Sequence, residues 1–148
     1  MLHFGRSRSR RGLASALIEE IAAVIDSIEG FEEVRKLEDM EFGAEEHLDE
    51  LAAFTLPKFS VYESNADRLD FFDAAIQRKI AYFFARAGGL AGHLHALAST
   101  KNESKELCKQ HAIDAQREIN GLSELADDLL RDLRKLVSKK PMKTISRA

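Results

Sequence analysis

Apolar residues spaced three or four positions apart in three long stretches constrain the fold of this chain more than any other feature. This spacing places the apolar side chains on one face of an α-helix, where they can pack against other helices. The stretches cover residues 13–37, 69–97 and 108–136. Strand-like alternation of apolar and polar residues is missing over any useful length. The sequence therefore predicts an all-α protein.

The segment between the first two stretches decides how the helices are arranged. Gly43 is a plausible stop for the first helix, residues 44–54 predict a short helix, and Pro57 ends it. Residues 55–63 should be extended or turning, so that the segment 44–63 is long enough to run back along the whole bundle. We expect this path, which gives an elongated antiparallel bundle of three long helices plus one short helix and an extended return segment. A compact connector is the alternative, and it would separate the two chain ends.

Charge is strongly segregated along the 148 residues. Residues 1–12 hold four arginines and no acid, and residues 131–148 hold seven Lys or Arg and one Asp. Residues 13–130 hold 11 basic and 24 acidic residues, so an acidic body lies between two basic ends. We predict a flexible basic tail over 1–12, a helical bundle domain over 13–138, and a second flexible basic tail over 139–148. The return path would bring both basic ends to one pole.

Polar residues suggest where the second and third helices begin, and glycines suggest which face of the second helix another backbone can approach. Ser64, Asn65 or Asp67 can cap the second helix, and Ser99 or Asn102 the third. Three glycines interrupt the second stripe, and they can let another backbone come close, within the chain or in a self-associated form. These glycines are Gly88, Gly89 and Gly92.

Residues able to bind a metal are few. Cys108 is the one cysteine, which excludes an internal disulfide and a cysteine-based zinc site within one chain. Cys108 and His111 share a helix face, but two ligands do not make a site. His93 and His95 lie two positions apart and point to different sides of a helix. We expect neither a metal nor a cofactor.

One pair of residues suggests chemistry. Arg86 and His93 are separated by six residues, and this spacing resembles the active motif of the HEPN helical ribonucleases. The resemblance implies that Arg86 and His93 act together on one RNA phosphate. A polar residue usually follows the arginine in that motif, and here it is Ala87.

The basic ends form a candidate binding surface. Arginines of the first tail can bind anionic lipid or an acidic partner, each basic residue contributing roughly 1 kcal/mol near a lipid surface. Nucleic acid is disfavoured, because the body is acidic and only Phe4 interleaves the basic tails. The candidate residues in the first tail are Arg6, Arg8, Arg10 and Arg11.

The central stretch "FTLPKFSVYESNADRLDFF" resembles a family of short, uncharacterised bacterial proteins. The matching positions are Pro57, Phe59, Val61, Tyr62, Asn65, Asp67 and Leu69, with Tyr82 and Phe83 similar to a later aromatic pair. The resemblance covers about residues 11–98. It implies a helical cytoplasmic part, held at the inner face of the membrane by an N-terminal span. Here Asp70 replaces a usual glycine, and the span is missing, so the start is either truncated or that of a soluble variant.

These observations favour a non-enzymatic interaction or scaffold module, which binds a protein partner or itself. The basic ends can also meet an anionic membrane surface. We expect a cytoplasmic protein with no small-molecule substrate, and Tyr62, Asn65 and Asp67 as candidate binding residues beside the basic tail. The alternative is a HEPN-like ribonuclease that uses Arg86 and His93.

Overall fold

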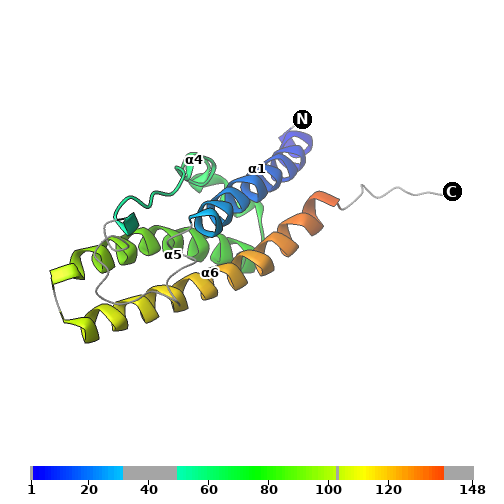
Figure 1. Cartoon of the computed structure of the whole chain (residues 1–148). Helices are drawn as coiled ribbons and strands as arrows, with labels where there is room; N and C mark the ends of the chain where they lie inside the picture. The colour runs from blue at the N-terminus through cyan, green and yellow to red at the C-terminus, as the bar shows by residue number, and fades with distance from the viewer. Residues whose placement is uncertain (1, 32–49, 103, 139–148) are drawn as a thin grey trace.

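The computed structural model describes residues 2–31, 50–102 and 104–138, and it describes no side chains for residues 1–9, 101, 102 and 105. Three long helices dominate: α1 (Leu2–Gly30), α5 (Ala74–Ala98) and α6 (Lys105–Ser138) (Figure 1). The shorter elements are the α-helix α4 (Ser60–Ser64) and the 3₁₀ turns η1 (Ala66–Phe71) and η2 (Ser99–Asn102). Across the described ranges there is no strand, which confirms the all-α prediction.

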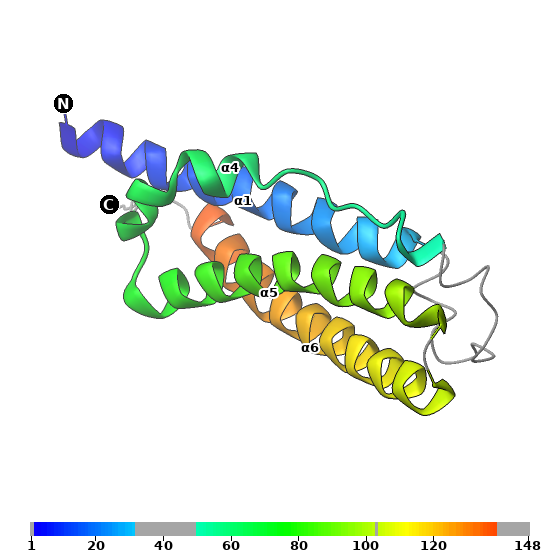
Figure 2. The ribbon, with the colours of Figure 1, turned by 90° about the vertical axis from the view of Figure 1, so that its left-hand side faces the viewer.

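Helix α6 packs against both α1 and α5 and runs antiparallel to each of them. The direction of α5 relative to α6 is clear from two side-chain pairs, since Lys79 meets Asp132 while Arg86 meets Glu118. Figure 2 shows the beginning of α1 and the end of α6 at the same pole of an elongated bundle. The predicted antiparallel arrangement of three long helices is therefore confirmed.

One continuous hydrophobic core joins the three long helices. Its members occupy the apolar stripes seen in the sequence, and many are completely buried. Burying a side chain of this size contributes about 1.5–3 kcal/mol, so the core supplies most of the driving force for helix packing. The largest fully buried residues of α1, α5 and α6 include Leu17, Ile21, Ile80, Phe83, Leu94 and Leu122.

Residues 54–64 return along α1 toward the start of α5 (Figure 2). Phe59 and Val61 pack against the core, and Tyr62 stacks on Phe84 with ring centroids 4.5 Å apart and 14° between the planes. At the other end, the ring nitrogen Nε2 of His95 lies 3.1 Å from the carbonyl oxygen of Phe54. The predicted return path is confirmed, except that residues 60–63, expected to be extended or turning, belong to the helix α4.

A carboxylate from α1 caps the short helix α4. The backbone N–H groups of Val61 and Tyr62 donate to the two carboxylate oxygens of Glu20, over 2.9 and 2.8 Å. Phe59, at the N-cap position of α4, has no side chain able to accept them. Glu20, on α1, therefore supplies the side-chain acceptor for the first N–H groups of α4, which a serine or aspartate at the N-cap position usually supplies.

The caps of α5 and α6 differ from those predicted. The Asp73 carboxylate accepts from the N–H of Ile76 at 2.9 Å and caps α5. The Ser104 hydroxyl accepts from the N–H of Leu107 at 3.2 Å at the start of α6. The turns η1 and η2 occupy the residues between, so the predicted caps of both helices were wrong. These were Ser64, Asn65 and Asp67 for the second helix, and Ser99 and Asn102 for the third.

Two boundaries of α1 differ from expectation. The helix begins at Leu2 rather than near residue 13, because arginine and serine are compatible with a helix. The first buried side chain among those described is nevertheless that of Leu13. It ends at Gly30, a residue type that is unfavourable in the interior of a helix. The predicted stop at Gly43, most of the short helix over 44–54, and the tail over 139–148 lie outside the described residues.

The glycines of α5 do not serve a close approach within the chain. A Cβ at Gly89 or Gly92 would meet nothing within 4 Å, and one at Gly88 would only touch the Phe59 ring at 4.0 Å. The prediction of a close backbone contact at these glycines is therefore wrong for the single chain. Self-association through them stays a prediction. In the part of the chain that the structure describes, no helix has the length and apolarity to cross a bilayer.

We predict that Glu20→Ala lowers the free energy of unfolding by about 2 kcal/mol, because it leaves two N–H groups of α4 without their charged acceptor. Glu19→Ala is the matched control, since Glu19 is exposed and its neighbour carries the contact. Urea unfolding followed by circular dichroism measures both. Equal losses in the two variants would contradict the capping role of Glu20.

Candidate functional site

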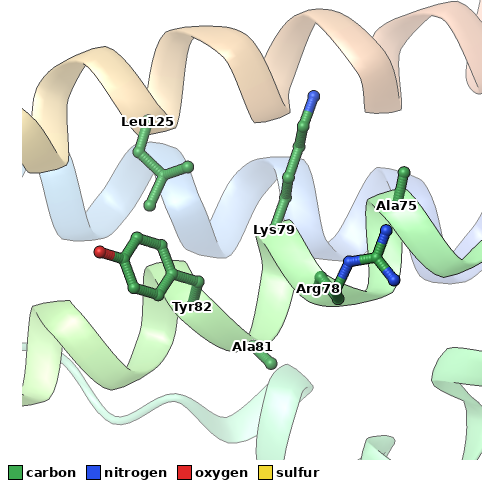
Figure 3. Close-up of a pocket in the computed structure, with 6 residues that line it drawn as sticks. All are labelled: Ala75, Arg78, Lys79, Ala81, Tyr82 and Leu125. Carbon is green, nitrogen blue, oxygen red and sulfur yellow. The ribbon is translucent and has the colours of Figure 1, made fainter.

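A shallow apolar groove lies along the seam between α5 and α6 (Figure 3). Its volume is about 700 Å³. Tyr82 is 55% exposed, the most exposed of the large apolar side chains that the structure describes, and Leu125 of α6 points toward it. The lining residues are Ala75, Arg78, Lys79, Ala81, Tyr82 and Leu125. Because tyrosine is enriched at protein interfaces, the exposed Tyr82 ring makes this groove a candidate site for another molecule.

The helical repeat explains why these side chains reach the surface. Ile80 and Phe83 are buried in the core, while Ala81 and Tyr82 between them turn outward. Ala75 and Ala81 also line the groove, and their side chains end at Cβ. Leu125 is half-buried and forms the α6 wall.

One end of the groove is fastened by a three-residue ion cluster. The ammonium Nζ of Lys79 lies 2.7 Å from carboxylate oxygens of both Asp128 and Asp132. Hydrogen bonds to Asp128 and then Asp132 raise the pKa of Lys79, and the bond from Lys79 lowers the pKa of Asp128. The charge of Lys79 is thus used to join α5 to α6.

Arg78, next to Lys79, carries the free charge of the groove. Its side chain is exposed, and no ion-pair partner for it exists among the described residues. Figure 3 shows its guanidinium close to Ala75, away from the ion cluster of Lys79. A ligand in the groove would therefore meet one available cation beside an apolar floor.

A second ion pair fastens the seam two turns further along α5. Arg86 Nε donates to Glu118 Oε1 over 2.8 Å, and its guanidinium carbon lies 5.3 Å from the Tyr82 ring centroid. Gly121 makes room for this side chain, since a Cβ there would lie 2.7 Å from Nη2 of Arg86. Bonding to Arg86 is the main reason that the pKa of Glu118 is lowered.

The structure brings the candidate pair Arg86 and His93 to one side of α5. His93 is exposed, and its charge makes a smaller contribution to lowering the pKa of Glu118. Glu118 therefore lies close to both residues. The guanidinium of Arg86 is already engaged by this carboxylate and by the Tyr82 ring, which leaves it poorly placed to hold a phosphate.

The predicted binding residues of the return segment do not converge. Tyr62 is half-buried against Phe84, the Asn65 amide donates to the carbonyl of Val61 at 2.9 Å, and Asp67 is exposed on η1. Among the residues with described positions, no group of three or more His, Cys, Asp or Glu is arranged to hold a metal ion.

Basic side chains gather at the pole where α1 begins and α6 ends. Arg10 and Arg11 are exposed on α1, whereas the side chains of Arg6 and Arg8 lie outside the description. On α6 a second surface hollow of about 560 Å³ is lined by Asp127, Arg131, Arg134, Lys135 and Ser138. Figure 2 shows both helix ends at this pole.

The groove residues were missed in the sequence. Among them, the sequence pointed only to Tyr82, as one of an aromatic pair. One signal was present: Arg78, Lys79 and Tyr82 fall off the apolar stripe of their helix. The sequence does not say which helix lies across from them, so the groove could not be assembled from it.

Comparison of the chain with protein-family models, with curated proteins and with solved structures gives no match. The resemblance of the central stretch to a bacterial family thus stays an expectation.

We predict that the stabilising effect of Glu118 is lost at acid pH. Its pKa in the folded chain is lowered below the ordinary 4.5, so its contribution is fully present above 4.5 and disappears as the pH falls through the folded value. The difference in unfolding free energy between the wild type and Glu118→Gln should be constant above about pH 5.5 and shrink below 4.5. Urea unfolding at a series of pH values measures this difference.

The control for this experiment is the same substitution in an Arg86→Met background. Arg86 is the main cause of the lowered pKa, so the pH dependence should largely vanish there. An unchanged pH dependence without Arg86 would show that another group stabilises the carboxylate.

Proposed function

We propose that this chain is a non-enzymatic interaction module whose α5–α6 groove receives an apolar helical segment of a protein partner. The observation that carries the proposal is the Tyr82 ring, 55% exposed above the apolar floor formed with Leu125. A groove between two helices is a common receptor for the apolar face of a third. Tyrosine and arginine, here Tyr82 and Arg78, are also the residue types that most often dominate binding energy.

Two ion-pair clusters join the helices that form the groove. Lys79 bridges to Asp128 and Asp132 at one end, and Arg86 bridges to Glu118 at the other. Both ion pairs join α5 to α6, so the spacing of the two helices is set by more than the core alone. A preformed groove loses little conformational entropy when it is occupied, which supports a binding role.

The ribonuclease alternative receives less support. A nuclease of that kind needs the arginine to stabilise a phosphate, and here a phosphate would have to displace Glu118 from Arg86 at 2.8 Å. The acidic carboxylate beside His93 would also repel the RNA backbone. We therefore place the function of this seam in partner binding.

One observation favours a second role, attachment to an anionic membrane surface at the inner face of the membrane. Helix α1 begins and α6 ends at the same pole, and Arg10, Arg134 and Lys135 are exposed there. Charge gathered at one pole orients a molecule toward an anionic surface more strongly than the same charge spread over two. The groove lies along the side of the bundle and stays accessible in this orientation.

The interaction role predicts a site-specific contact at Tyr82. Benzoylphenylalanine placed at position 82 in the full chain should, after irradiation in the native cells, give a discrete covalent adduct seen by gel mobility and mass spectrometry. Position 109 is the control, since Lys109 is exposed on α6, 16 residues from Leu125. If position 82 gives no adduct above that of position 109, the interaction role of the groove is refuted.

The membrane role predicts binding to vesicles that contain phosphatidylserine, but not to purely zwitterionic vesicles. The triple change Arg6→Ser, Arg8→Ser and Arg10→Ser should weaken co-sedimentation at least about tenfold at low ionic strength. The control removes three basic residues outside the two tails and outside the basic pole, with Lys58→Ser, Lys109→Ser and Arg117→Ser. Equal weakening by both triple changes would contradict a role for the basic pole.

A further inference from the structure

Exposed cations flank one end of the groove on both helices. This end is marked by Lys79, which lies beside Asp128 and Asp132. Arg78 is the residue before Lys79 on α5, and Arg131 lies between the two aspartates on α6, so both arginines stand at this level of the seam. Arg78 lines the groove and is exposed, and Arg131 keeps 63% of its side chain exposed. Each wall therefore presents one guanidinium at this end.

The same end carries an excess of positive charge. Nζ of Lys79 lies 2.7 Å from an oxygen of each aspartate, Asp128 and Asp132. Arg131 reaches only Asp128, over 3.4 Å, and Arg78 has no ion-pair partner among the described residues. Three cations thus share two carboxylates. Both arginines are more exposed than either aspartate, so the outer surface at this end is cationic.

The opposite end of the groove is not cationic. Arg86 is bonded to Glu118 there, and Glu124 is exposed on α6 at about the level of Tyr82. Beyond the cationic end, the carboxylate of Asp73 is used to cap α5. Positive charge therefore rises along the groove from Tyr82 toward the pole where α1 begins and α6 ends (Figures 2 and 3). A bound segment would be oriented by this gradient.

We propose that the occupant of the groove is an acidic amphipathic helix of another protein; this inference rests on the interaction role proposed above. An apolar side chain of that helix covers Tyr82 and Leu125. Its carboxylates, one turn nearer the pole, bind Arg78 on one side and Arg131 on the other. Positions three and four residues from the apolar one point to opposite sides of it, by roughly 60° and 40°. The partner therefore carries acidic residues at both of these positions.

A second copy of this chain does not supply that pattern. A two-fold axis along the helices brings Arg78 of one copy to Arg131 of the other, since the two arginines share one level of the seam. An axis across the helices stacks α5 on α5, and Ala74–Ala98 contains no acidic residue. Like charges meet in the first case, and Arg78 finds no carboxylate in the second. The charges of the groove thus favour a different protein.

The test uses the full chain with benzoylphenylalanine at position 82, irradiated in the native cells. Arg78→Glu together with Arg131→Glu should lower the yield of adduct at least about fivefold, because each new carboxylate then faces an acid of the partner. Lys58→Glu together with Lys109→Glu is the matched control, since both lysines are exposed outside the groove and the change in net charge is the same. Urea unfolding compares the stability of the two double variants.

Mass spectrometry of the adduct gives the sequence of the linked peptide. We expect two acidic residues, three and four positions from the linked residue on the same side of it. Lysine at these two partner positions should abolish the adduct with the unchanged chain, an outcome that does not depend on the stability of any groove variant. The same lysines should restore the adduct with the Arg78→Glu, Arg131→Glu chain, which a misfolded chain could not do.

The acidic-helix inference is overturned by a linked peptide without these acids, or by an adduct that the partner lysines leave unchanged. In both cases the interaction role stands. An adduct to a second copy of this chain would also overturn it, as would an adduct to lipid or nucleic acid. The absence of any adduct at position 82 would remove the interaction role of the groove as well.

Discussion

The carboxylate of Glu20 fixes the direction of the chain between the first two long helices. By accepting the N–H groups of Val61 and Tyr62, it ties the return segment to α1. Stacking of Tyr62 on Phe84 then joins the same segment to α5. Since the chain returns along the bundle before α5 begins, α1 and α5 run the same way and α6 opposes both. That the start of α1 and the end of α6 share a pole follows from this single reversal.

The seam between α5 and α6 shows how a structural contact also shapes a surface. Lys79 and Arg86 are paired with acids of α6, so their charges join α5 to α6. The groove residues that take no part in these ion pairs include Tyr82, Leu125 and Arg78. A Cβ at Gly121 would lie 2.7 Å from Nη2 of Arg86, so a larger residue there would make the Arg86 side chain shift. We thus propose partner binding at the groove surface that remains exposed after α5 and α6 have packed together.

Predictions from the sequence succeeded where the signal is a repeated pattern. The three apolar stripes gave the three long helices, because burying a continuous face repays the cost of ordering each helix. Pro57 and the apolar residues around it indicated the return path correctly. The predictions of the capping residues were wrong. Ser64, Asn65 and Ser99 are chemically able to cap a helix, but the turns η1 and η2 follow them, so that Asp73 caps α5 and Ser104 caps α6.

The sequence by itself determined the helical class, the residues of the core and the segregation of charge, because these depend on local periodicity and composition. The tertiary structure decided which helices are neighbours. It therefore decided that Glu20 meets Val61 and that Tyr82 meets Leu125, contacts between residues about 40 positions apart in the chain. Periodicity says which face of a helix is apolar, but not which helix covers it. The candidate site is made of such pairings, so it became visible only when the helices were placed side by side.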